Sequence, residues 1–296
     1  MKPKYLLLLF LIGFSTSSFG QMKQVKVNGA EFNYTDKGSG VPIVFIHGGL
    51  EDYRTWDAQV DRFSKNYRVI AYSRRFNFPN KNTKQIKDFS AKTEAEDLAA
   101  LIQQLNLGRV HLVGHSFGGL VSLFLTKNHP ELVQTLTLSE PALISWLPKI
   151  KDGKILHDNF YNQLWKPVKQ AFEINDTLAV LKHTLIYFAG EDILDKLPGE
   201  VKTQFLVNIP EWHAIAYSSD PFSDFKNEYF KEIKVPTLLL SGGQTLPILQ
   251  LTNKELRSTL PNASLYNLPE ATHDYWLTHP GQMGDAILNF LQTALK

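Results

Sequence analysis

Continuous apolar runs that end in glycine or in small polar residues constrain this chain more than any other feature. Residues 42–49 read PIVFIHGG, residues 67–73 read YRVIAYS and residues 109–116 read RVHLVGHS. Unbroken apolar runs of this length are typical of strands buried on both faces, which a parallel sheet requires. Between them, residues 93–107 place apolar side chains at helical spacing and close with Gly108. This alternation predicts an α/β fold.

The rest of the chain continues the alternation. Asn28-Gly29 separates two extended runs near the start, which predicts a β-hairpin. The other predicted elements are strands over 133–140, 235–243 and 263–269, a helix from Gly118 to His129-Pro130, and a last amphipathic helix over 284–295. Short connections between alternating strands and helices predict a doubly wound, mostly parallel sheet with helices on both faces.

One long region departs from this pattern. Residues 141–233 contain no buried-strand signal, yet they hold 14 of the 35 aromatic residues. We therefore expect a helical lid inserted over one edge of the sheet, with most of these aromatic side chains in the lid's own core and a few facing a pocket. The α/β core is then made of residues 21–140 and 234–296.

The first twenty residues read as a separate segment. Lys2 and Lys4 precede an apolar stretch over 5–14, and small residues follow up to Gly20. This order predicts a signal peptide over 1–20 that is removed before Gln21, and hence a periplasmic or secreted protein. The alternative is an uncleaved anchor, but the stretch is shorter than the roughly 20 residues that span a bilayer. We expect no stable membrane anchor after cleavage.

Composition excludes several classes of protein. The chain has 31 basic and 29 acidic residues, a formal charge of +2, so electrostatics give no reason to expect a nucleic-acid partner. It contains no cysteine, which excludes disulfides and a lipid anchor on cysteine. At 43% hydrophobic, 296 residues can bury a large core. We expect a small-molecule substrate and neither a metal nor a cofactor; the oligomeric state stays open.

The stretch GHSFGG, from Gly114 to Gly119, fits the pattern G-x-S-x-G between a predicted strand and a predicted helix. A sharp strand-to-helix turn raises its central side chain above the sheet, and small flanking residues let the backbone pass close by. The sequence therefore predicts Ser116 as a nucleophile. The same turn directs the amide of Phe117, at the start of the helix, toward a developing oxyanion.

A serine hydroxyl needs a base to remove its proton, and nine histidines are candidates. His273 follows the last predicted strand, at the sheet edge where ligands bind in doubly wound folds. It is the predicted base. His115 lies inside the turn and is expected to point away from the serine, and we interpret His47 and His279 as structural.

These residues together resemble the α/β-hydrolase-fold serine hydrolases, of esterase and lipase type with a helical lid. The resemblance covers residues 22–296 and depends on His47-Gly48-Gly49 after one strand, GHSFGG after another, and the late His273. It implies that the backbone amide of Gly49 joins that of Phe117 in an oxyanion hole. Two such donors contribute several kcal/mol in the transition state.

The chain departs from this family in the position of the triad acid. The family most often places it after the strand that follows the lid, but no aspartate or glutamate occurs between Ile233 and Lys254. Glu140, at the end of the preceding strand, is the predicted substitute; its alternative role is to bond the backbone at the strand-to-lid corner. Asp274 competes because it adjoins His273, although adjacent side chains usually project apart.

Other polar residues near the predicted site leave two interpretations open. Arg74 and Arg75 either bind a substrate carboxylate or, as we favour, brace loops. Asp52 and Tyr53 are weak candidates for the pocket mouth.

The predicted function is hydrolysis of a small or medium ester by an exported serine hydrolase. The alternatives are a carbon–carbon bond, amide or peptide hydrolase of the same fold, and a non-catalytic ligand-binding homologue.

Overall fold

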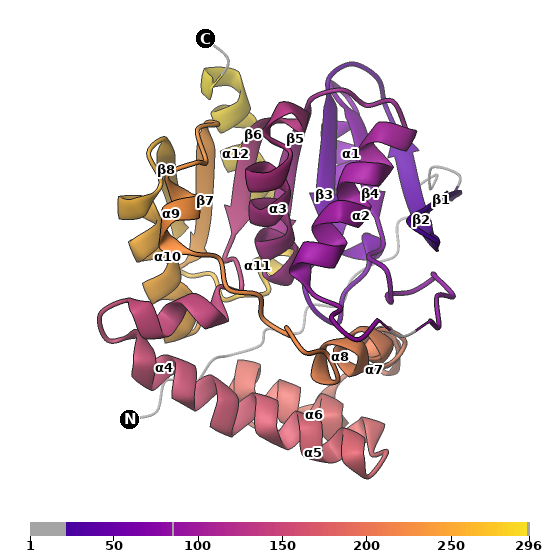
Figure 1. Cartoon of the computed structure of the whole chain (residues 1–296), viewed down its shortest axis with the longest axis vertical. Helices are drawn as coiled ribbons and strands as arrows, with labels where there is room; N and C mark the ends of the chain where they lie inside the picture. The colour runs from indigo at the N-terminus through magenta and orange to yellow at the C-terminus, as the bar shows by residue number, and fades with distance from the viewer. Residues whose placement is uncertain (1–21, 85, 295–296) are drawn as a thin grey trace.

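Eight strands form one sheet in the computed structural model, which describes residues 22–84 and 86–294 (Figure 1). Their order across the sheet is β1-β2-β4-β3-β5-β6-β7-β8. The strands are β1 (Lys23–Val27), β2 (Ala30–Lys37), β3 (Pro42–Ile46), β4 (Arg68–Tyr72), β5 (Val110–His115), β6 (Val133–Ser139), β7 (Thr237–Gly242) and β8 (Ala263–Leu268).

Neighbouring strands from β4 to β8 are parallel, whereas β1 and β2 form the predicted antiparallel hairpin at one edge. Asn28 and Gly29 connect the hairpin with φ angles of 48° and 72°, the left-handed geometry of a type I′ turn. β5 and β7 are buried at every residue, as their unbroken apolar runs predicted. The mostly parallel α/β fold is therefore confirmed.

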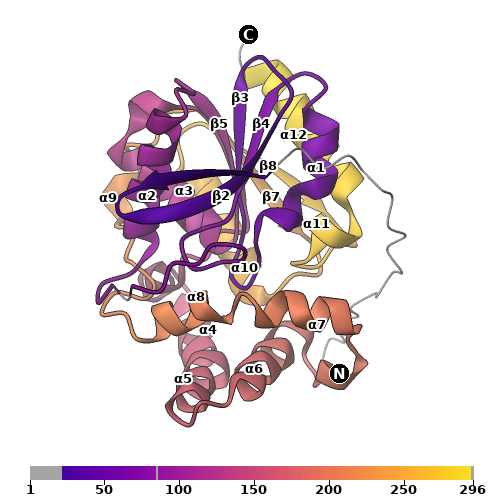
Figure 2. The same cartoon turned by 90° about the vertical axis from the view of Figure 1, so that its right-hand side faces the viewer.

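Helices cover both faces of the sheet. They are α1 (Asp57–Phe63), α2 (Ala91–Gln104), α3 (Phe117–Asn128), α10 (Pro247–Thr259), α11 (Tyr275–Thr278) and α12 (Pro280–Ala294). Figure 2 shows α2 and α3 on one face and α1 and α12 on the other. Two apolar clusters follow these faces, with Leu98 and Leu120 in one and Trp56 and Ile287 in the other. α12 begins four residues before its predicted start, because proline suits the first turn of a helix.

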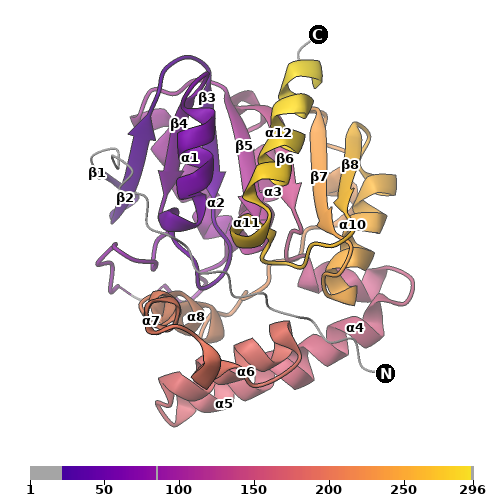
Figure 3. The ribbon, with the colours of Figure 1, turned by 180° about the vertical axis from the view of Figure 1, so that it is seen from behind.

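The described chain between β6 and β7 contains helices and no strand. The helices are α4 (Gly153–Phe160), α5 (Lys166–Glu173), α6 (Thr177–Ala189), α7 (Gly199–Leu206), α8 (Ile209–Ala216) and α9 (Asn227–Phe230). We call residues 141–233 the helical segment. Figures 1 and 3 show α4 to α8 gathered beyond the ends of the strands, on one side of the molecule. Its aromatic rings pack against one another, with the centroids of Trp165 and Phe222 4.8 Å apart.

The predicted signal peptide, residues 1–20, lies outside the described residues. Within the described ranges, none of the helices combines the length and the apolar character that a membrane crossing needs.

Candidate active site

Three side chains singled out in the sequence follow neighbouring parallel strands. Ser116 comes directly after β5, Glu140 directly after β6, and His273 five residues after the end of β8. β7 lies between β6 and β8, so the carboxyl ends of these strands meet at one edge of the sheet. Ligands bind at this edge in doubly wound folds.

The backbone at Ser116 makes a sharp turn between β5 and α3. Its φ of 50° and ψ of −115° lie outside the regions that side chains other than glycine favour, and α3 begins at the next residue. The flanking glycines are required for steric reasons. A Cβ on Gly114 would lie 2.4 Å from Ser122 Oγ, and a Cβ on Gly118 would lie 2.4 Å from the carbonyl oxygen of Ile46. This geometry matches the strained turn predicted from G-x-S-x-G.

Glu140 bonds the imidazole of His273 from the strand next to the one where the acid was expected. Its Oε2 lies 2.5 Å from His273 Nδ1 and also accepts a hydrogen bond from Thr245 Oγ1 at 2.9 Å. Oε1 accepts a hydrogen bond from the amide of Gly242, the last residue of β7, at 2.7 Å. The side chain of Glu140 is fully buried, so these bonds replace water around the carboxylate. The carboxylate therefore lies over the tip of β7, whose own loop carries no acid.

Asp274, the competing acid, has a different partner. Its Oδ1 accepts a hydrogen bond from the hydroxyl of Thr272. The carboxylate that contacts the His273 imidazole is that of Glu140.

Ser116 and His273 both lie beside His115. The ring centroids of His115 and His273 are 4.6 Å apart. A Cβ on Gly48 would lie 3.0 Å from His115 Nδ1 and 3.1 Å from Ser116 Cβ, so the serine borders the same small space. In the part of the chain that the structure describes, Ser116 Oγ itself makes no hydrogen bond. Phe188 of α6 stacks on the His273 ring at 5.7 Å, with 12° between their planes.

The prediction for His115 was wrong. Its side chain does not point away from the site but packs against His273, because it ends β5 at the carboxyl edge. His115 Nδ1 lies 3.2 Å from Glu51 Oε1. Glu51 was missed in the sequence, although it follows Gly48 by three residues and bonds its amide at 2.7 Å through Oε2. An acid at that spacing after a glycine turn was the available signal.

Glu51 and His115 each favour the charged form of the other. Burial alone disfavours both charges, but the nearby imidazole and the bond from Gly48 lower the pKa of Glu51 to about 2. At His115, burial lowers the pKa of the imidazole, but nearby groups, the Glu51 carboxylate first among them, raise it by more, so the pKa is above its ordinary value. The pair formed by Glu51 and His115 therefore lies beside the imidazole of His273.

This pair predicts a pH-dependent stability loss in the variant Glu51→Gln. Glutamine can still accept the Gly48 amide but cannot pair with a charged imidazole. The raised pKa of His115 means that the pair stabilises the fold below pH 6.5, the ordinary histidine value, and is lost as pH rises past the raised pKa. The depressed pKa of Glu51 means that its contribution is complete above pH 4.5 and is lost as pH falls toward 2.

We expect Glu51→Gln to lower the free energy of unfolding by about 2 kcal/mol at pH 6 and by clearly less at pH 9, measured by urea denaturation. Glu270→Gln, which changes an exposed glutamate, serves as the control for loss of one negative charge. An equal loss at both pH values would show that the charge pair does not form.

In the loop after β3, the amides on either side of Gly49 are bonded to side chains. Gly48 N donates to Glu51, and Leu50 N donates to Glu211 Oε2 of α8 at 2.9 Å. The amides of Gly49 and Phe117 have no acceptor among the described residues. The turn at Ser116 predicted the Phe117 amide for an oxyanion hole, and the family resemblance implied the Gly49 amide. Phe117 is the first residue of α3, where the helix dipole favours negative charge.

Comparison with known proteins identifies the family. The model of the α/β-hydrolase fold family matches residues 41–280. The chain belongs to the α/β-hydrolase family. A Synechocystis protein that carries the name of a non-heme chloroperoxidase is 29% identical over 272 residues, covering 88% of this chain and 94% of that protein.

A second sequence relative and a solved structure are also similar to this α/β-hydrolase. The 2-hydroxy-6-oxo-6-(2'-aminophenyl)hexa-2,4-dienoic acid hydrolase of Metapseudomonas resinovorans is 24% identical, covering 90% of this chain and 89% of that protein. The structure of an esterase from Exiguobacterium antarcticum superposes with a TM-score of 0.73 at 21% identity, covering 93% of this chain and all of that one. The family and the dienoic acid hydrolase support hydrolase activity, whereas the esterase structure, at 21% identity, shows the shared fold.

The two arginines after β4 brace the hydrolase loops, as we favoured. Arg74 is fully buried and donates to the carbonyl oxygens of His47 and Gly48 at 3.1 and 2.9 Å. Arg75 holds Asp97 through two hydrogen bonds of 2.6 and 2.7 Å.

His47 has the structural role that we expected. Its Nε2 accepts a hydrogen bond from the amide of Arg74 at 2.9 Å, and its Nδ1 lies 2.9 Å from the carbonyl oxygen of Gly48. Burial, reinforced by the charge of Arg74, lowers its pKa to about 3, so the ring is neutral.

Asp52 does not line a pocket mouth. It is fully buried, its Oδ1 accepts from the amide of Arg54, and its Oδ2 accepts from Asn208 Nδ2 at 2.7 Å. Tyr53, half-buried, packs against the apolar cluster that contains Trp56. Both residues join the loop after β3 to its surroundings, because polar groups buried there need partners inside the protein.

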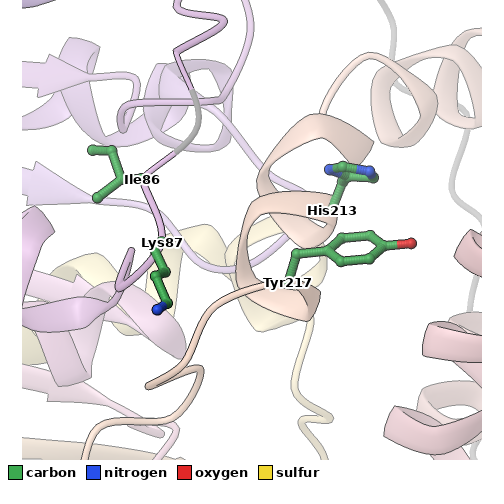
Figure 4. A pocket seen from close by; sticks show the side chains of 4 residues that line it. All are labelled: Ile86, Lys87, His213 and Tyr217. Atoms are coloured by element: carbon green, nitrogen blue, oxygen red, sulfur yellow. The ribbon is translucent and has the colours of Figure 1, made fainter.

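Two open hollows on this hydrolase lie away from the triad candidates. One, of about 330 Å³, is lined by Ile86, Lys87, His213 and Tyr217, at the end of α8 (Figure 4). The other, of about 370 Å³, lies between β7, β8 and α10 and includes Gly242. Neither is lined by Ser116 or His273. Across the described ranges, no three histidine or acidic side chains are grouped so as to hold a metal ion.

Proposed function

We propose that this α/β-hydrolase is a serine hydrolase that cleaves an ester of a small or medium carboxylic acid. Ser116 is the nucleophile, His273 the general base and Glu140 the acid that orients it. The observation that carries the proposal is the 2.5 Å contact between Glu140 Oε2 and His273 Nδ1, at the edge of the sheet where the strained turn raises Ser116.

The bond to Glu140 assigns the protons of the imidazole. If Nδ1–H donates to the carboxylate, Nε2 is left with a free lone pair to accept the proton of Ser116. The serine oxygen then forms a bond to the acyl carbon, and His273 returns the proton to the leaving alcohol. Water repeats the sequence on the acyl-enzyme, and the acid product leaves. The amides of Gly49 and Phe117 bind the oxyanion in both halves of the reaction.

The contact between Ser116 and His273 must close during this reaction. Ser116 Oγ makes no hydrogen bond in the described structure, whereas the bond from His273 to Glu140 is already formed. Catalytic hydrogen bonds are often long without substrate and tighten in the bound complex. The side chain of His273 is 17% exposed, so it is not closed off completely by its neighbours.

The helical segment is proposed to serve as the lid over this site. Phe188 of α6 stacks on the His273 ring, and Trp212 of α8 reaches Gly49. An aromatic surface of this kind favours an ester with an apolar acyl or alcohol group, because burying apolar area stabilises the bound complex.

A second candidate function is cleavage of a carbon–carbon bond. It is favoured by the similarity to the dienoic acid hydrolase of Metapseudomonas resinovorans. The same serine and histidine can serve both reactions, and the lining of the pocket decides between them. A non-catalytic ligand-binding role is the third candidate, and the intact Ser116 and His273 argue against it.

Labelling with a fluorophosphonate probe tests the proposal. The probe forms a covalent bond only with an activated serine, so we expect one label per chain, located on Ser116 by peptide mass spectrometry. Turnover of chromogenic esters, amides and lactones, compared with a vinylogous diketone substrate, then separates ester from carbon–carbon cleavage. Failure to label, with no turnover of any ester, contradicts the proposal and favours a binding role.

Export also stays a proposal, supported by the order of charged, apolar and small residues over 1–20. Mass spectrometry of the protein from its host should find a chain that begins at Gln21. A chain that retains Met1 contradicts it.

A further inference from the structure

The indole of Trp212 lies against the residue that the proposed reaction needs for oxyanion binding. A Cβ on Gly49 would lie 2.9 Å from Trp212 Nε1, and the next two atoms of the indole lie at 3.6 and 3.8 Å. Contact of 2.9 Å is closer than a Cβ atom tolerates, so no side chain fits at position 49 while the indole stays in place. The edge of the indole that carries the N–H therefore faces Gly49.

The N–H of Trp212 is free to bind a ligand. In the described part of the chain, Nε1 has no hydrogen-bond partner. The residue is 8% exposed, and Nε1 is not among the buried polar atoms that lack a partner, so this atom is in contact with solvent. Buried tryptophan usually satisfies its N–H, and an open one beside an open amide, that of Gly49, indicates a shared acceptor.

Glu211, the residue before Trp212, holds α8 against the residues on both sides of Gly49. Its Oε2 accepts the amide of Leu50 at 2.9 Å. Its Oε1 bonds the guanidinium of Arg74, which donates to the carbonyl oxygen of Gly48 at 2.9 Å. Glu211 and Arg74 are both fully buried, so water does not compete for these bonds. α8 is thereby attached to the loop before and after Gly49.

We propose that Trp212 is a third hydrogen-bond donor of the oxyanion site, supplied by the helical segment. Its Nε1–H binds the substrate carbonyl oxygen together with the amides of Gly49 and Phe117. This inference rests on the proposed serine-hydrolase function and adds a specificity rule to it. The substrate must carry an oxygen that can accept three hydrogen bonds as it becomes negative, which the tetrahedral intermediate of an ester provides.

The test is the variant Trp212→Phe, which keeps a large aromatic ring and removes the N–H. The matched control is Trp165→Phe, because Trp165 packs against Trp212 and lies in the same aromatic cluster. We expect kcat for a chromogenic ester to fall roughly 10- to 100-fold in Trp212→Phe, with KM changed by less than about threefold. The rate of fluorophosphonate labelling should fall with kcat, because the phosphonyl oxygen occupies the same position.

Trp165→Phe should stay within about threefold of the natural chain in kcat and labelling rate, since it removes no donor from the site. If Trp212→Phe loses no more activity than this control, the inference is overturned, while labelling of Ser116 still upholds the proposed function. If the natural chain is neither labelled nor active on esters, both proposals fail. Thermal unfolding of each variant separates loss of the donor from loss of the fold.

Discussion

Replacing Ser116 with alanine is expected to reduce ester turnover by at least about 10⁴-fold. The variant removes the hydroxyl oxygen that we propose forms the acyl-enzyme, while His273, Glu140 and the open amides stay in place. Residual turnover then depends on binding and the oxyanion site alone. Initial rates with a chromogenic ester, at enzyme concentrations high enough to detect slow turnover, measure the effect.

The fold should survive this substitution. The backbone at Ser116 already has a φ of 50°, and alanine carries the same Cβ as serine, so the change adds little strain. The serine hydroxyl makes no hydrogen bond in the described structure, so none is lost. We expect the thermal midpoint of Ser116→Ala to stay close to that of the natural chain. Turnover that persists with intact folding would assign the chemistry to another group.

Replacing Glu140 with glutamine is expected to lower kcat by about 10²- to 10⁴-fold. Glutamine can keep its oxygen on the Gly242 amide, which leaves its NH₂ group facing His273. That group is a donor, so the imidazole must present Nδ1 as an acceptor and carry its proton on Nε2. Nε2 can then no longer accept the proton of Ser116. A carboxylate that stabilises the charged imidazole is lost as well.

Two matched variants make this experiment specific. Thr245→Val removes the 2.9 Å bond to Glu140 Oε2 but keeps the acid, and we expect a loss of less than about tenfold. Asp274→Asn changes the competing acid, which bonds Thr272, and should leave kcat nearly unchanged. Rates measured across pH 5 to 9 separate a changed histidine from a damaged fold. A near-normal rate in Glu140→Gln, or a large loss in Asp274→Asn, would assign the acid elsewhere.

Much of the architecture could be predicted because it depends on local pattern. The apolar run before Gly48 can only be buried on both faces, and Asn28-Gly29 suits a two-residue turn. Ser116 was recognisable from its glycines, since the backbone passes too close for any side chain at positions 114 and 118. The sequence also predicted that the helical segment contains no strand. Each of these features depends only on residues that are close together in the sequence.

The acid illustrates a prediction that needed topology as well as pattern. Because the loop after β7 carries no acidic residue, Glu140 at the end of β6 became the candidate. β6 and β7 are adjacent and parallel, so their carboxyl ends lie side by side. No sequence pattern indicated the φ of 47° at Glu140 or its 2.5 Å contact with His273. The structure also shows why Asp274 is elsewhere: it bonds Thr272 two residues before it.

The pairing of side chains from distant segments could not be read in advance. Glu51 and His115 are 64 residues apart, and Glu211 meets Leu50 across 161 residues. Neither contact has a periodic signal, because each depends on how loops at the sheet edge fold over one another. His115 was misplaced for this reason: its strand was predicted, but the neighbours on its side of the edge were not known.

The sequence by itself determined the α/β core and the strained turn at Ser116, because apolar periodicity and steric limits on glycine act locally. Only the tertiary structure decided which carboxylate bonds His273, that a charged pair lies beside it, and that Trp212 of the helical segment meets Gly49. The physical reason is the difference in range. Backbone conformation follows from neighbouring residues, whereas hydrogen bonds between side chains depend on packing that brings remote strands and helices together.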